Sequence, residues 1–253
     1  MFYQGDLSGD FPDIKTTHLS MGIDFGYKPG KIFAFYLGYT IGKLSGADSL
    51  VSGKEKRNLH FYTLVHDFRL QTSIDLKAIL RKIWPNKIVG RSDFEPGFTG
   101  PNLILGVGML KFNPKGEKNG QVYQLQKLGT EGQYIPNGNY GEPYKLWSFN
   151  IKYGFGMGYN LGRQLNLEAQ LIYTKTFTDY LDDVSSEYPD YNQLIASDNG
   201  ETTAFFTYGG NDGSTKPKGS LRGNPGTQDS FITLGFKLTY TFGRSEFQRI
   251  MNL

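Results

Sequence analysis

The stretch FNIKYGFGMGYNL, residues 149–161, decides the fold of this 253-residue chain. Its odd-numbered residues are all apolar or aromatic, and its even-numbered residues are Asn, Lys or Gly. Because successive side chains of a strand point to opposite faces, this alternation predicts a strand with one oily face and one small, polar face. The run is also longer than the strands of soluble sandwiches, which average about 5 to 6 residues, and it matches a tilted strand that crosses a bilayer.

The same alternation recurs along the whole chain. The further runs cover residues 18–27, 33–42, 64–75, 102–112, 165–174 and 232–242. We take Met1–Tyr3 as the end of a first strand, which brings the count to eight strands in one domain spanning residues 1–253. The links at 28–31 and 162–164 are tight, whereas those at 4–17, 43–57, 113–146 and 178–229 are long and polar. Short and long links alternate in this way in outer-membrane barrels, with short periplasmic turns and long outer loops.

Composition narrows the class of protein. No window offers the 18 or so apolar residues of a transmembrane helix, and 19 Phe with 17 Tyr argue against disorder. A formal charge of +3 does not indicate nucleic-acid binding, and the absence of Cys excludes disulfide scaffolds and thiolate metal sites. The sequence therefore predicts an all-β protein, an eight-stranded antiparallel transmembrane barrel of a Gram-negative outer membrane with both termini periplasmic. A lipocalin-like soluble barrel is the alternative. It fits less well because glycines crowd the polar face, as the interior of a small closed barrel requires.

Charges on the polar faces of the runs predict what fills the barrel. In an eight-stranded barrel the interior is just wide enough for side chains, and opposite charges there should pair because an unpaired buried ion is costly. We therefore expect a plugged interior, with ion or proton conduction as the alternative. The expected interior set is Asp24, Asp67, Arg69, Asp75, Lys152, Glu168 and Lys237.

Residues 76–98 interrupt the pattern on the short-turn side. Leu76–Ile83 has the spacing of an amphipathic helix that Pro85 stops, which predicts a short basic helix at the periplasmic face. The helix can anchor in the membrane interface or dock a protein partner. The chain then continues past the last strand as a tail, residues 243–253. The residues expected to contact a partner on this side are Lys77, Arg81, Lys82, Lys87, Arg91, Phe247 and Ile250.

Two further groups raise chemical hypotheses. Asp179, Asp182 and Asp183 cluster at the outer rim and could offer oxygens to Ca²⁺, with hydrogen bonding within the rim as the alternative. His18 and His60 are the candidates for catalysis, but no Gly-x-Ser-x-Gly elbow accompanies them. We expect no enzyme and no cofactor.

Several strings carry a resemblance to a known family. They are Tyr3–Leu7, Asn58–Leu70, Lys111–Lys115, Leu128–Gln133, Lys175–Ser185, Arg222–Pro225 and Phe236–Phe242, in this order along nearly the whole chain. The string Thr-Phe-Thr-Asp-Tyr-Leu-Asp-Asp, residues 176–183, is the most distinctive. Together they resemble the Bacteroidota outer-membrane β-barrel family that includes the PorG component of the type IX protein secretion system.

The resemblance implies a role as well as a fold. It implies an eight-stranded outer-membrane barrel that acts as an anchor or interaction subunit of a secretion complex, in contact with periplasmic lipoprotein and ring subunits. Outer-membrane lipid and lipopolysaccharide are the other expected partners, and no nucleic acid is expected. The alternatives are a stand-alone OmpA-like barrel for envelope structure or adhesion, and a narrow channel.

Overall fold

The chain is all-β in its main architecture, as expected, with few and short helices. The computed structural model describes residues 1–9, 13–84, 97–136, 138–211, 213 and 216–243. Every helix in these residues is too short or too polar to cross a membrane. The strands are β1 (Phe2–Gln4), β2 (Ser20–Tyr27), β3 (Phe33–Ala47), β4 (His60–Asp75), β5 (Gly97–Lys111), β6 (Lys115–Lys118), β7 (Gln121–Gln124), β8 (Trp147–Asn160), β9 (Leu165–Thr176) and β10 (Ser230–Tyr240).

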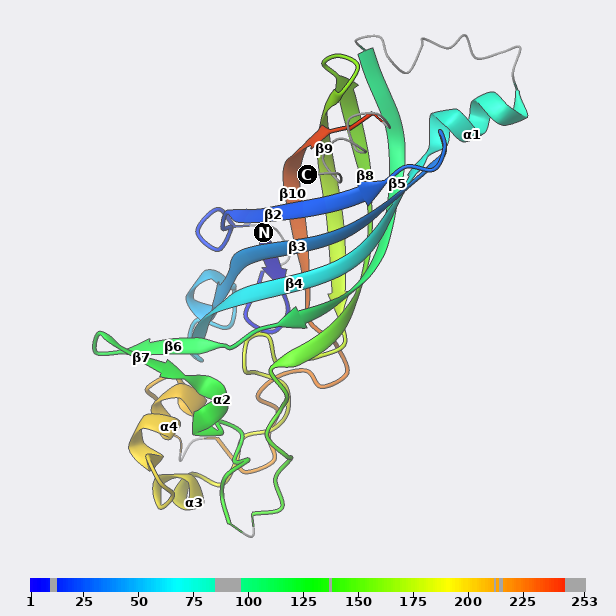
Figure 1. The fold of residues 1–253 in the computed structure, drawn as a ribbon. Coiled ribbons are helices and arrows are strands. Elements are labelled where there is room, and N and C mark those ends of the chain that lie inside the picture. The colour runs from blue at the N-terminus through cyan, green and yellow to red at the C-terminus, as the bar shows by residue number, and fades with distance from the viewer. Residues whose placement is uncertain (10–12, 85–96, 137, 212, 214–215, 244–253) are drawn as a thin grey trace, which may run out of the picture.

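These strands form one curved antiparallel sheet (Figure 1). Its order is β1-β10-β9-β8-β5-β4-β3-β2, and the hairpin β6–β7 branches from β4. Each predicted run corresponds to a strand, because the period of two fixes which face of a strand is buried. The expected count of eight differs from the observed ten, because the hairpin β6–β7 lies in a stretch that we had interpreted as a polar loop.

The described strands do not close into a complete barrel. β1 has three residues and pairs with β10 only at Phe2, Tyr3 and Gln4, so the path ends at β1 and at β2. The two ends nevertheless touch. Met1 and His18 exchange two backbone hydrogen bonds, of 2.5 and 3.0 Å.

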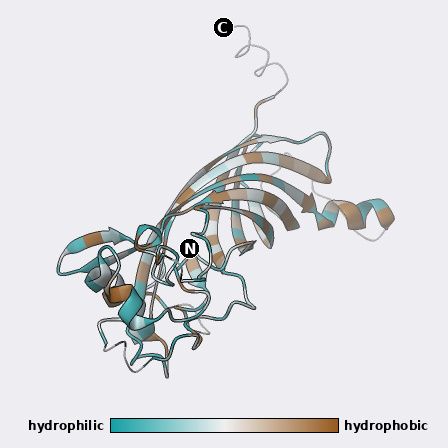
Figure 2. Cartoon of the chain, turned by 90° about the horizontal axis from the view of Figure 1, so that it is seen from below, coloured by the Kyte–Doolittle hydropathy of each residue, from teal (hydrophilic) through white to brown (hydrophobic). Residues whose placement is uncertain are grey.

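The sheet is inverted relative to that of a soluble protein. Along β8 the residues Trp147, Phe149 and Phe155 are exposed, whereas Asn150 and Lys152 are buried. The register aligns such residues across neighbouring strands, so that they form a continuous surface. Brown segments follow the strands in Figure 2. We call this surface the apolar belt; its exposed members include Leu37, Phe68, Leu70, Val107, Met109, Phe149, Ile151, Tyr153, Phe155, Leu171, Leu234, Phe236 and Leu238.

The hydrophobic core lies at one end of the sheet, where the inward face changes from polar to apolar. Here Leu44, Val65, Leu110 and Phe231 are buried within the sheet together with Tyr3 of β1. Residues 48–59, 113–146 and 177–229 cover this end, and we call them the loop layer. The loop layer contains β6, β7, α2 (Leu125–Leu128), α3 (Tyr191–Ile195) and α4 (Gly200–Tyr208), and it supplies Phe206, Leu181 and Val184 to the core.

The predicted basic helix forms at the opposite end of the sheet. It is α1 (Leu76–Ile83), which projects away from the strands in Figure 1. Asp75 begins it: the carboxylate accepts a hydrogen bond of 2.8 Å from the Ala78 backbone N–H. Asp75 was expected inside the barrel, and this expectation is wrong, because β4 ends at Asp75 and its side chain caps the helix.

Candidate functional site

A chain of ion pairs crosses the interior of the sheet. Asp67 Oδ2 lies 2.9 Å from Lys152 Nζ and 3.8 Å from an Arg69 guanidinium nitrogen. Arg69 in turn lies 2.7 Å from Asp24 Oδ1, and Lys237 Nζ lies 3.0 Å from Asp24 Oδ2. The structure thus brings together five of the seven residues expected in the interior. These five residues come from β2, β4, β8 and β10. Their positions in the strands alone could not have shown that the residues are in contact.

Glu168, another residue expected in the interior, is hydrogen-bonded to neutral side chains. Its carboxylate accepts hydrogen bonds from Asn102 Nδ2, at 2.8 Å, and from Gln170 Nε2, at 3.0 Å. Lys237 also lies over the Tyr36 ring, 3.3 Å from its centroid. The paired charges and the aromatic ring occupy the space between the strands. This arrangement places charges of both signs beside one another on the inward face.

The loop layer contains a second buried ion network. Arg222 Nη1 lies 3.0 Å from Glu131 Oε1, and Nη2 lies 3.5 Å from Asp183 Oδ2. The same guanidinium donates to the carbonyl oxygens of Asp183 and Phe206. Glu131 further accepts from the backbone N–H groups of Ser185 and Ser186. The strings that carry the family resemblance at 128–133, 175–185 and 222–225 therefore meet in one place, where they hold the loop layer together.

A third buried group joins the loop layer to β1. The Tyr3 hydroxyl lies 2.6 Å from Asp182 Oδ2 and 2.7 Å from Asp229 Oδ1. A hydroxyl has one proton to donate, so it cannot donate to both carboxylates at once. Burial raises the pKa of Asp182 and of Asp229 well above the usual range, and the charge of Asp182 raises that of Asp229 further. The pair therefore binds protons more tightly than free carboxyl groups do.

The geometry does not support calcium binding at the outer rim. Asp182 is bound to Tyr3, and Asp183 accepts hydrogen bonds from Thr130 and Tyr144 and pairs with Arg222. Burial raises the pKa of Asp179 to about 7. Within the described residues no group of three acidic, His or Cys side chains could hold a metal ion. The long polar link 178–229 contains α4, whose residues Thr203, Phe206 and Thr207 are buried.

The histidines lack the partners of a catalytic site. His18 Nε2 lies 2.7 Å from Ser45 Oγ, and His66 Nδ1 lies 2.7 Å from the Tyr39 hydroxyl. The His60 ring contacts the Glu117 backbone. In the part of the chain that the structure describes, none of the three is paired with a carboxylate that would orient it as a base.

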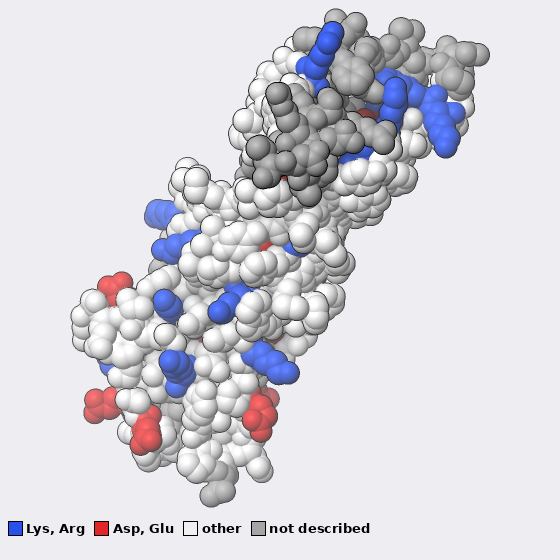
Figure 3. Space-filling model, in the orientation of Figure 1, with Lys and Arg blue, Asp and Glu red and all other residues white. Residues whose placement is uncertain are grey.

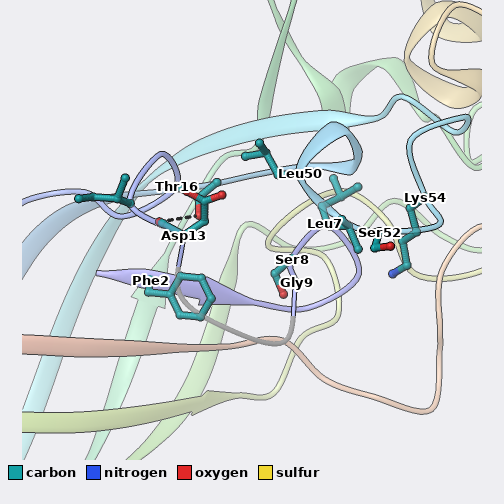
Figure 4. Close-up of a pocket in the computed structure, with 11 residues that line it drawn as sticks. Phe2, Leu7, Ser8, Gly9, Asp13, Thr16, Leu50, Ser52 and Lys54 are labelled. Atoms are coloured by element: carbon teal, nitrogen blue, oxygen red, sulfur yellow. Dashed lines mark hydrogen bonds between the residues drawn. The ribbon is translucent and has the colours of Figure 1, made fainter.

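Two surface features complete the candidate sites. A groove of about 690 Å³ lies between the N-terminal segment and the loop after β3, lined by Leu7, Leu50 and Lys54 among others (Figure 4). Within this lining the Asp13 carbonyl oxygen accepts a hydrogen bond from the Thr16 hydroxyl.

On α1, Lys77 and Arg81 are half-buried and Lys82 is exposed. In the view of Figure 3 basic side chains gather at the α1 end, and acidic ones at the loop layer. The other expected contacts, Lys87, Arg91, Phe247 and Ile250, lie outside the described residues.

Comparison with known proteins identifies no relative of this chain. No family model, curated protein or solved structure matches the chain.

The buried Arg222 network predicts a large effect of removing its cation. In Arg222→Met the carboxylates of Glu131 and Asp183 lose their counter-ion, which should destabilise the loop layer by about 3 to 5 kcal/mol. Hydrogen-exchange mass spectrometry of residues 181–186 measures this as faster exchange. Adding Glu131→Gln should recover part of the loss because it removes one buried charge. Lys56→Met, an exposed control, should change nothing. Equal exchange in Arg222→Met and in the control would contradict a role for the network.

The raised pKa of the Asp182–Asp229 pair predicts a loop layer that is more stable at pH 5 than at pH 8. The folded pKa of this carboxyl pair is raised above the unfolded value of about 3.9, so the folded state binds more protons. Its stability is therefore lost as pH rises through the folded pKa. Asp182→Asn should be more stable than wild type at pH 8 and less sensitive to pH, because its amide can donate to Tyr3 without titrating. Hydrogen exchange at both pH values, corrected for intrinsic rates, tests this. A variant with unchanged pH sensitivity contradicts a role for the raised pKa of this pair.

Proposed function

We propose that the chain is a membrane-spanning β-barrel of a Gram-negative outer membrane, plugged by its own side chains, that acts without catalysis as an anchor or interaction subunit. The inverted sheet is the observation that carries this proposal. Phe155, Leu234 and Phe236 are 60%, 75% and 81% exposed, while the charged Asp67 and Lys152 are 2% and 5% exposed. A soluble barrel has the opposite arrangement, and soluble monomers rarely expose contiguous apolar surface beyond a few hundred Å². Lipid is the environment that matches both faces.

Contacts across the two ends of the sheet support barrel closure. Lys237 of β10 pairs with Asp24 of β2 at 3.0 Å, although no ladder joins these strands in the described residues. Met1 and His18 add backbone hydrogen bonds at the same seam. Closure matters because an open edge in lipid leaves backbone N–H and C=O groups without partners.

The filled interior favours an anchor or interaction role over a channel. The ion pairs among Asp24, Asp67, Arg69 and Lys152 occupy the middle, and the apolar core seals the end beneath the loop layer. Function should then reside on the outer surfaces. By its resemblance to the Bacteroidota family, we propose a subunit of a type IX protein secretion complex, with the basic residues of α1 facing periplasmic partners. A stand-alone envelope or adhesion barrel is the second candidate, favoured by the ion-paired loop layer.

Lipid contact can be measured with tryptophan quenching. Phe155→Trp in a Trp84→Phe, Trp147→Phe background places one indole in the middle of the apolar belt. In bilayers of phospholipids with brominated acyl chains, its fluorescence should fall strongly, because bromine quenches at contact. Lys127→Trp in the same background reports the loop layer and should keep its fluorescence. If neither variant is quenched in vesicle-bound protein, the belt does not face lipid.

The partner proposal predicts which charges hold a complex together. A tagged chain extracted from its native outer membrane in mild detergent should bring stoichiometric periplasmic subunits with it. Lys77→Glu, Arg81→Glu and Lys82→Glu together should release them, because the surface changes sign. The matched set Lys56→Glu, Lys127→Glu and Lys145→Glu in the loop layer should not. Undiminished co-purification with the α1 set, in correctly assembled barrels, would overturn the assignment of α1, and a partner-free wild type would favour the stand-alone barrel.

A further inference from the structure

Three lysines surround a pocket just beyond the apolar belt, on the side of the loop layer. The pocket has a volume of about 360 Å³, and its lining includes Lys43, Lys111, Lys115, Tyr62, Leu64 and His66. Register explains why they converge. Tyr62, Leu64 and His66 are alternate residues of β4 and share its outward face, where they pair with Lys115 of β6, Lys43 of β3 and Lys111 of β5 respectively. We call this the basic pocket.

The charges of the basic pocket are uncompensated. No carboxylate lines the pocket, and among the described residues none of its three lysines forms an ion pair. Two of the lysines are positioned by aromatic rings instead: Lys43 Nζ lies 4.8 Å from the centroid of Tyr62, and Lys111 Nζ lies 5.4 Å from that of Trp147. Three lysines line one hollow that no carboxylate lines, which favours an anion with several oxygens because lysine is a common point-charge ligand of phosphate.

The position of the pocket distinguishes a lipid from a soluble anion. Ile41, His66, Lys111 and Trp147 are paired in one row across β3, β4, β5 and β8. The next row toward the middle of the sheet is Tyr39, Phe68, Met109 and Phe149, and the row after it is Leu37, Leu70, Val107 and Ile151. Positive charge thus borders directly on exposed apolar surface. That combination matches an amphiphile with an anionic head and hydrocarbon chains.

We propose that the basic pocket binds the phosphate-bearing headgroup of a glycolipid in the outer leaflet, with the acyl chains lying along the apolar belt. The inference rests on the proposed membrane-spanning barrel and adds to it a defined lipid site. Lys43, Lys111 and Lys115 bind phosphate oxygens, and Tyr62 and Leu64 contact the apolar face of the sugar. The volume accommodates the phosphorylated sugar of such a headgroup.

The experiment uses Trp147 as its reporter, because its ring lies beside Lys111. The full chain carrying Trp84→Phe is placed in neutral phosphatidylcholine bilayers and exposed to lipid A that bears two phosphates. Dephosphorylated lipid A is the matched ligand, and inorganic phosphate is the competitor. Fluorescence of Trp147 and native mass spectrometry of the detergent-extracted protein report binding. We expect retention of the phosphorylated form, weaker retention of the dephosphorylated form, and no displacement by millimolar phosphate.

Variants test the three lysines directly. Lys43→Gln, Lys111→Gln and Lys115→Gln together should weaken binding at least about tenfold, since each basic group near a charged lipid surface contributes appreciably to affinity. The corresponding Lys→Arg set keeps the charge and should bind, which separates loss of charge from loss of folding. Lys56→Gln, Lys127→Gln and Lys145→Gln remove equal charge from the loop layer and should leave binding intact.

The outcomes separate this inference from the proposed function. Equal binding of both lipid A forms, full displacement by inorganic phosphate, or equal loss in the two Lys→Gln sets would overturn the basic pocket as a lipid site. Quenching of Phe155→Trp by brominated phospholipid would still hold in each of these cases. If that quenching is itself absent, the membrane proposal fails first.

Discussion

The rest of the structure depends on the ion pairs enclosed by the sheet. Asp67 with Lys152, and Asp24 with Arg69 and Lys237, place opposite charges within 3.0 Å on the concave face. A face that holds paired charges cannot also bury the apolar side chains of the same strands, because alternate residues point in opposite directions. Phe149, Phe155 and Leu234 are therefore exposed. The interior charges and the apolar belt have the same cause: the charged residues of each strand face inward, so the apolar residues between them face outward.

The two ends of the sheet have different structures for the same reason. At the loop layer the inward face becomes apolar, and Val65, Leu110 and Phe231 bury a conventional hydrophobic core. A core of this kind can order long connections, and the Arg222–Glu131 network and the Tyr3–Asp182–Asp229 group then fix them. At the other end the described residues form no such core, and α1 begins at its Asp75 cap and projects outward. Order in the loop layer thus comes from burial, not from the composition of its sequence.

Among the described residues, the candidate binding features lie on the outer surface. The histidines contact hydroxyl or backbone groups. The outside carries the apolar belt, the basic helix and the three lysines of the basic pocket. The occupants proposed for these surfaces are lipid chains, a partner or headgroup of opposite charge, and phosphate. The proposed role as an anchoring barrel follows from this distribution.

The alternation of residues along the chain already predicts the eight strands of the main path, the inward and outward face of each, and the helix at Leu76–Ile83, because the periods of strands and helices are local properties. It does not predict the hairpin β6–β7. The sequence also indicated that inward charges of both signs would have to pair. Only the tertiary structure decided which pairs form, since Asp24 and Lys237 are distant in sequence and meet through curvature of the sheet. It likewise decided that Asp75 caps a helix, that Asp182 and Asp183 bind Tyr3 and Arg222, and that residues 200–208 are a buried helix. Long-range packing fixes these features, and a period of two carries no information about it.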